Sequence, residues 1–163
     1  MIEPIIGFFF FSLFVIFIIK TTNKNREKQY LILIEGIKAE TKLYVEQSKT
    51  SSITIGKKNR DFLFNQCDLY LTTDALIILG FNKDSFFKQL SLPIILTQQQ
   101  NKFSNRFPFA FVKTINNINF ENNIVKINFG EKGITSTEVV LKLKSLNEKE
   151  IEKIKEIATK NNW

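Results

Sequence analysis

The sequence contains no histidine and a single cysteine, Cys67, among its 163 residues. Without histidine it lacks the commonest general base and the commonest zinc ligand. One cysteine excludes an intramolecular disulfide and a thiolate-rich metal site. Six glycines are spread singly, and none belongs to a GxGxxG or GxxxxGK[ST] phosphate-binding loop. We therefore expect no cofactor, no metal ion and no enzyme activity.

One long apolar run opens the chain. Residues 5–19 contain nothing more polar than Gly7 and Ser12. As a helix, residues 1–19 would extend about 28 Å, close to the ~30 Å thickness of a hydrocarbon core. We expect a retained transmembrane helix over residues 1–20. A cleaved signal peptide and a buried core helix are the alternatives, but no basic side chain precedes the run and no Ala-x-Ala follows it.

Basic side chains are concentrated after the apolar run. The chain has a net charge of +7, and Lys20, Lys24, Arg26 and Lys28 follow the run directly. By the positive-inside rule we expect the N-terminus outside and the C-terminal part in the cytoplasm, at the cytoplasmic (inner) membrane. The basic composition favours acidic partners such as anionic lipid, with a solvated lysine-rich surface as the simpler alternative.

The rest of the chain divides into two parts by its pattern. Residues 21–50 are expected to form a basic juxtamembrane linker and then a helix that leads out of it and ends near Lys42 or Tyr44, although residues 41–47 alternate like a strand. Residues 51–163 follow as a β domain with a C-terminal helix. Its expected strands cover residues 52–56, 61–65, 68–73, 75–81, 91–98, 110–120, 124–130 and 137–144.

Three local signals in this domain are specific. Thr72, Thr73 and Asp74 separate two apolar segments and predict a tight hairpin. The pair Asn122-Asn123 predicts a second hairpin, because asparagine tolerates positive φ. Near the end of the chain, Asn147 with Glu150, or Ser145 with Glu148, predicts a capped helix start. The apolar stripe of that helix is Ile151, Ile154, Ile157 and Ala158.

A family resemblance rests on three stretches of this domain. "DLYLTTDALIILGF", "AFVKTINNINFENNIVKINF" and "TSTEVVLKLKSLNEKEIEKIKEI" are similar to the strand pairs and the closing helix of the pleckstrin-homology (PH) superfold, which includes bacterial PH-like and GRAM-like domains. The resemblance covers residues 52–160. It implies an α+β fold: an N-terminal transmembrane helix, then an antiparallel PH-like β-barrel or sandwich closed by a C-terminal amphipathic helix. It also implies a binding function, since few members are enzymes.

Two groups of residues are candidate contacts for lipid or a partner. Members that read phosphoinositides carry basic residues in the first hairpin loop, and the resemblance places Lys57, Lys58 and Arg60 there, with a solvent-facing turn as the alternative. The second group interleaves basic and aromatic side chains and consists of Lys102, Phe103, Arg106 and Phe107. Such a segment suits a bilayer interface or a protein partner. A folded-back loop with its phenylalanines in a satellite cluster is the alternative.

These observations lead to one functional prediction and one alternative. We expect a single-pass, non-catalytic, membrane-anchored PH-like domain that binds a protein partner or anionic lipid at the cytoplasmic membrane face. The alternative is a structural or assembly subunit of a membrane complex that contacts its partners through its span. The expected partners are the lipid bilayer and a membrane or cytoplasmic protein. Nucleic acid is not expected, because a protein fixed to a membrane is poorly placed for it.

Overall fold

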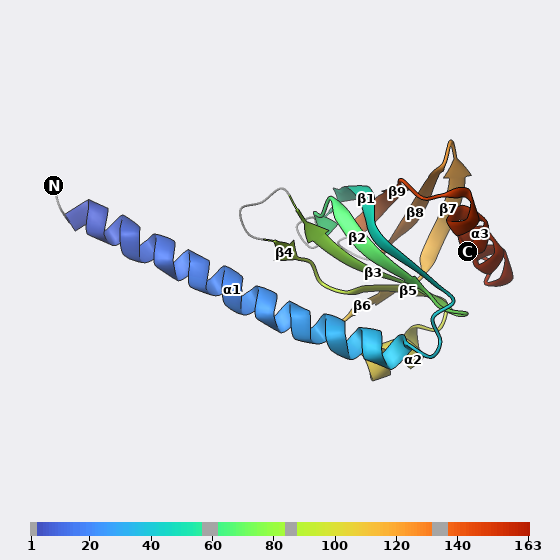
Figure 1. Ribbon diagram of the computed structural model, residues 1–163, viewed down its shortest axis with the longest axis horizontal. Helices are drawn as coiled ribbons and strands as arrows, with labels where there is room; N and C mark the ends of the chain where they lie inside the picture. The colour runs from blue at the N-terminus through green and yellow to red at the C-terminus, as the bar shows by residue number, and fades with distance from the viewer. Residues whose placement is uncertain (1–2, 57–61, 84–87, 132–136) are drawn as a thin grey trace.

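The structure, a computed structural model, describes residues 3–56, 62–83, 88–131 and 137–163. A long N-terminal helix, α1 (Glu3–Ile37), leads into a nearly closed β-barrel, and a helix packs against the barrel at the end of the chain (Figure 1). The predicted α+β class is confirmed. The division of the chain at residues 20 and 50 stays a prediction.

Helix α1 is continuous from the apolar run into the polar segment. Residues 21–29, expected as a linker, are helical, because they contain neither proline nor glycine and are rich in good helix formers. The helix ends at Ile37, earlier than expected, and the Thr41 hydroxyl donates a hydrogen bond to the Ile37 carbonyl at 3.0 Å. With 35 residues it is about 52 Å long. The helix that contains the apolar run therefore extends well into the folded domain.

The described strands form one mixed sheet. They are β1 (Leu43–Ile55), β2 (Gln66–Leu71), β3 (Ala75–Asn82), β4 (Gln89–Leu90), β5 (Ile94–Thr97), β6 (Phe111–Lys113), β7 (Ile115–Glu121), β8 (Ile124–Glu131) and β9 (Thr137–Lys144). Their order is β6-β5-β3-β2-β1-β9-β8-β7, with β4 on the end of β3. The antiparallel expectation fails at one pair, since β5 and β6 are parallel. Strands β6 and β8 approach each other, which nearly closes the barrel.

Both hairpins were predicted correctly. Strands β2 and β3 are joined at residues 72–74, where the Thr72 hydroxyl accepts a hydrogen bond from the Ala75 amide at 3.0 Å. Strands β7 and β8 turn at Asn122 and Asn123, with φ angles of 49° and 60°. The expected strand at 61–65 is wrong over its described residues. Residues 62–65 are irregular, and Phe62 and Phe64 fill the barrel instead.

Strand β3 is buried on both faces, which explains its unbroken apolar sequence. Leu76 and Ile78 point into the barrel core. Ala75, Ile77 and Leu79 point outward, into a second cluster beneath α1 and the short helix α2 (Gln100–Arg106). The molecule thus has an inner core and an outer core that share this strand.

Helix α3 (Glu148–Lys160) packs against the inner core at one end of the barrel. Asn147 and Glu150 form the predicted capping box, with the Glu150 amide 2.9 Å from Asn147 Oδ1. Ile154, Ile157 and Ala158 are buried, so the predicted stripe is confirmed. Asn161, beyond the end of the helix, donates a hydrogen bond to the Thr73 carbonyl at 2.9 Å and ties α3 to the β2–β3 turn.

Candidate functional site

The candidate site is a groove between α1 and the outer side of β2, β3 and β4. Two polar side chains of α1 hold the helix there. The Tyr30 hydroxyl lies 2.8 Å from the Gly80 carbonyl oxygen and 3.0 Å from that of Ser91. Asn23 donates to the Lys88 carbonyl and accepts from the Leu90 amide at 3.1 Å. These contacts of Asn23 and Tyr30, called here the docking contacts, join α1 to strand β4 and its neighbour β3.

Apolar packing completes the attachment near the end of α1. Leu33 and Ile37 are fully buried in the outer core. Gly36 lies against the Phe107 ring, so that a larger residue would not fit without movement. Asn23, Tyr30 and Ile37 recur at intervals of seven residues, which places them on one face of a helix. A sequence prediction that included residues 21–29 in the helix would have identified this face from the seven-residue spacing.

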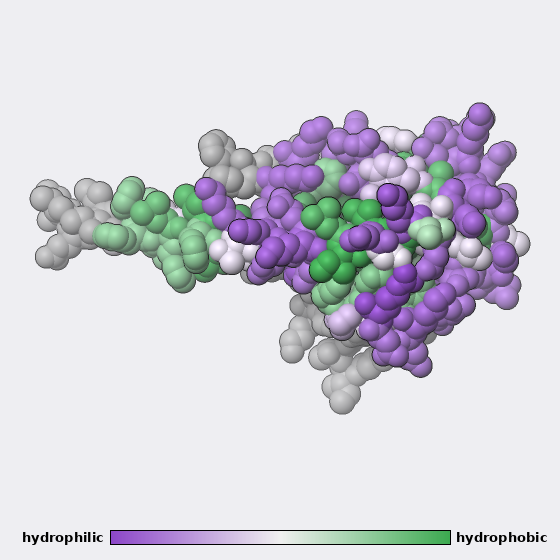
Figure 2. All heavy atoms as spheres, turned by 60° about the horizontal axis from the view of Figure 1, so that its bottom comes forward, coloured by the Kyte–Doolittle hydropathy of each residue, from purple (hydrophilic) through white to green (hydrophobic). Residues whose placement is uncertain are grey.

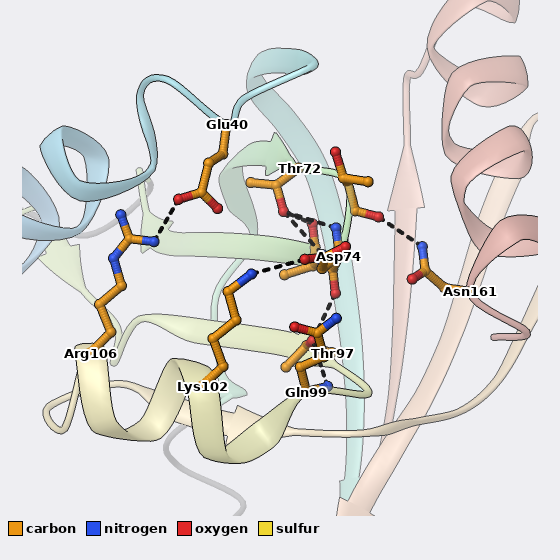
Figure 3. Close-up of polar contacts among 10 residues, drawn as sticks. Glu40, Thr72, Asp74, Thr97, Gln99, Lys102, Arg106 and Asn161 are labelled. Carbon is orange, nitrogen blue, oxygen red and sulfur yellow. Dashed lines mark hydrogen bonds and ion pairs between the residues drawn. The ribbon is translucent and has the colours of Figure 1, made fainter.

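The predicted contacts on α2 are mostly engaged within the protein. Phe103 and Phe107 are 0% and 2% exposed. They fill the outer core and do not face a lipid or partner, which is the satellite-cluster arrangement. Lys102 forms an ion pair with Asp74 at 2.9 Å, and Arg106 pairs with Glu40 at 2.6 Å (Figure 3). A contact of Lys102 or Arg106 with a ligand stays a prediction. Lys57, Lys58 and Arg60 lie outside the described residues.

Two cavities open along the groove. The first has a volume of about 450 Å³, and its lining residues are Thr22, Arg26, Leu63, Asn82, Gln89, Leu90, Ser91 and Leu92. The second has about 320 Å³, and its lining residues are Glu27, Tyr30, Leu31, Asp68, Phe81, Lys88 and Leu90. Leu90 borders both. Volumes of this size suit small-molecule groups or single side chains of a partner.

The side of the groove facing β1 and β2 is aromatic and acidic. The rings of Tyr44 and Tyr70 lie 4.6 Å apart between their centroids, on the same outer face as Asp68. Burial raises the pKa of the Tyr44 hydroxyl, and the nearby Asp68 carboxylate raises it further. Burial and the Asp68 carboxylate also raise the pKa of Tyr70. A hydrogen bond with Tyr44 lowers this pKa, but the net shift is upward. Both tyrosines therefore stay neutral at physiological pH beside a negative charge.

Cys67 and the carboxylates do not assemble a reactive or metal-binding centre within the described chain. The Cys67 side chain is fully buried in the inner core, and burial raises the pKa of its thiol well above the usual value. Over residues 3–56, 62–83, 88–131 and 137–163, no three side chains of the metal-ligating types Cys, Asp and Glu come together. The groove offers hydrogen-bonding, charged and apolar surface.

Comparisons of the chain with protein-family models, curated proteins and solved structures give no match. The class of protein is therefore defined by the fold alone. The protein is an α+β protein in which a nearly closed β-barrel follows an N-terminal helix. That helix is long and apolar enough to cross a membrane.

Proposed function

We propose that this protein is a single-pass membrane protein with a PH-like barrel, which acts without catalysis by binding a protein partner at the cytoplasmic membrane face. The strand order β5-β3-β2-β1-β9-β8-β7 supports the PH-like assignment, since two antiparallel groups of strands meet at β1. The position of α3 supports it too, because its buried stripe closes one end of the barrel. The basic flank after the span, including Lys20 and Lys24, supports the cytoplasmic placement.

The observation that carries the proposal is the continuity of α1 with the domain. Asn23 lies four residues after Ile19, about 6 Å along the helix axis. From there to Ile37 the helix is bound to the barrel by the docking contacts and by apolar packing. A domain attached in this way cannot swing on a flexible tether. Its outer face therefore has a fixed height and orientation relative to the bilayer, as a membrane-side binding platform requires.

The exposed surface around the groove favours a protein as the partner. Leu31 and Ile32 on α1 are 66% and 56% exposed, and Tyr44 on β1 is 46% exposed. Figure 2 shows an apolar patch over the middle of the molecule, where the C-terminal half of α1 lies, bordered by hydrophilic residues. Two acidic residues, Glu27 and Asp68, and one basic residue, Lys88, line the second cavity beside it, which leaves an excess of one negative charge there. A segment with apolar and basic side chains complements this surface, and the cytoplasmic flanks of membrane spans are rich in Lys and Arg.

Site-specific photocrosslinking in cells tests the proposal. A photoreactive amino acid replaces Leu31 in the full-length protein, and replaces Glu152 on the far-side helix α3 as the matched exposed control. We expect a discrete protein adduct from position 31 that is absent from position 152. Adducts at neither position, or equal adducts at both, would contradict a binding face at the groove.

Exchange of the span separates this proposal from the assembly-subunit alternative. Residues 5–19 are replaced by an unrelated apolar helix of equal length, which leaves the docking contacts intact. We expect the adduct from position 31 to persist. Its loss, with the protein still folded and in the membrane, would mean that the span itself recognises the partner.

A further inference from the structure

We propose that the 450 Å³ cavity beside Thr22 and Arg26 binds the phosphate group of an anionic phospholipid from the surrounding leaflet. This inference rests on the proposed membrane insertion of α1 and is independent of the protein partner. It concerns a lipid site formed by the anchor helix and the strand β4 that docks on it. The basic residues expected in the first hairpin loop play no part in it.

The depth of the cavity matches the headgroup layer. Thr22 and Arg26 follow Ile19 by three and seven residues, which places their Cα atoms about 4.5 Å and 10.5 Å beyond the apolar run. The polar layer of a bilayer leaflet is roughly 5–8 Å thick. Side chains on a helix lean toward its N-terminus, which is here the membrane side. The Arg26 Cα thus lies just beyond this layer, and its guanidinium, which contacts Gln29 in this structure, would reach the lipid phosphates by turning toward the membrane.

The charge of the cavity lining selects an anion. Arg26 is a lining residue, whereas no carboxylate lines the cavity among the described residues. The guanidinium donates one hydrogen bond to Gln29 Oε1 at 2.9 Å and keeps further N–H donors, since arginine has five. Planar bidentate donation is the geometry in which arginine binds phosphate. The second cavity differs, because two carboxylates, Glu27 and Asp68, line it together with Lys88.

The remaining lining suits the rest of a lipid headgroup. Thr22 and Gln89 add polar side chains to the lining. Leu63, Leu90 and Leu92 form an apolar wall, and Leu63 is 56% exposed. A glycerol backbone and the first acyl carbons require such a wall next to the phosphate site. The single basic group and its apolar surroundings fit a phosphodiester lipid such as phosphatidylglycerol.

The test uses delipidated full-length protein and native mass spectrometry. The protein is titrated with equal concentrations of phosphatidylglycerol and phosphatidylcholine of matched chains, and separately with inorganic phosphate. We expect retention of phosphatidylglycerol over phosphatidylcholine, and no competition by phosphate at equal concentration. Arg26→Gln should reduce the phosphatidylglycerol preference about tenfold, because a charge-assisted hydrogen-bond site is lost.

The matched control is Lys28→Gln, which removes the same charge from the same segment on an exposed face of α1. This variant should keep the preference. Equal losses of the phosphatidylglycerol preference in both variants would overturn the site, since they would show a non-specific attraction between lipid and basic residues. Binding of inorganic phosphate as tight as that of the lipid would overturn the lipid assignment. Either failure leaves the photocrosslink at position 31 unchanged, so it is distinguishable from a failure of the proposed function.

Discussion

The side-chain oxygen of Asn23 accepts a hydrogen bond from the backbone amide of Leu90 at 3.1 Å, and its amide nitrogen donates to the Lys88 carbonyl. A residue just beyond the apolar run of α1 thus pairs with the backbone of a barrel strand. This pairing holds strand β4 against α1, close to the apolar segment of the helix. Helix α1, with its apolar N-terminal run, and the barrel are parts of one fold.

Removal of the Tyr30 hydroxyl should weaken the attachment of α1. Tyr30→Phe leaves the Gly80 and Ser91 carbonyl groups without this donor while it preserves the ring packing. We expect a loss of about 1–2 kcal/mol in the free energy of unfolding, measured by urea titration of the full-length protein in detergent. Thr21→Ala, at an exposed position of the same helix, is the control and should change stability by less than about 0.5 kcal/mol. Equal effects of the two changes would contradict the role of the Tyr30 hydrogen bonds in attaching α1.

Gly80 should tolerate no side chain. A Cβ atom at this position would overlap the ring of Phe64, which fills the inner core beside β3. We expect Gly80→Ala to destabilise the protein by about 1–3 kcal/mol through overpacking, measured by thermal unfolding.

A double mutant separates this effect from a loss of strand propensity. Phe64→Leu removes ring atoms from the same space, so the double mutant should be more stable than the sum of the two single effects predicts. Simple additivity would show that the Phe64 contact is not the cause.

The thiol of Cys67 should be inert in the folded protein. Burial favours its neutral form, which is unreactive toward thiol reagents. We expect labelling at pH 8 to be slow in the native state and to become fast across the urea unfolding transition. Rapid labelling of the native protein would contradict the burial of this side chain.

The same group makes stability fall in alkali. Its pKa is raised in the folded state, so the unfolded chain loses the proton first as the pH rises. The contribution of the Cys67 thiol to the free energy of unfolding is complete below the ordinary thiol pKa and is lost as the pH increases above it. Cys67→Val should therefore reduce the decrease in unfolding free energy between pH 8 and pH 10. An unchanged pH slope would show that the thiol does not contribute.

The inertness of Cys67 allows a direct test of topology. Lys149→Cys places a reactive thiol on the exposed first turn of α3 without removal of the native cysteine. With the barrel in the cytoplasm, a membrane-impermeant maleimide should label this thiol only after lysis. Labelling of intact cells would reverse the proposed orientation.

The sequence predicts those parts of the fold whose structure depends on residues close together in the chain. The Asn122-Asn123 turn, the capping box at Asn147 and the alternation of Val139, Leu141 and Leu143 each depend on neighbouring residues. The hydrophobic pattern of these segments therefore gives their element type and buried face directly.

The features that sequence analysis missed depend on contacts between distant segments. The polar residues 21–29 favour a helix locally, but their attachment to the barrel depends on Asn23 and Tyr30, which contact segments fifty or more residues later in the chain. The burial of Phe103 and Phe107 was one of the two alternatives that the sequence left open, and it depends on the meeting of α1, α2 and β3. Residues 62–65 resemble a strand in sequence, but they are irregular in the structure, and Phe64 fills the space beside Gly80 of strand β3. No local pattern encodes these arrangements.

Amide hydrogen exchange of residues 21–30, in the full-length protein reconstituted in lipid nanodiscs, tests the central claim most directly. That claim is that α1 passes without interruption from the membrane into the barrel. A continuous, docked helix predicts protection of these amides comparable to that of residues 31–37. Exchange at the rate of an unstructured chain would identify a flexible linker and contradict a barrel held at fixed height on the membrane.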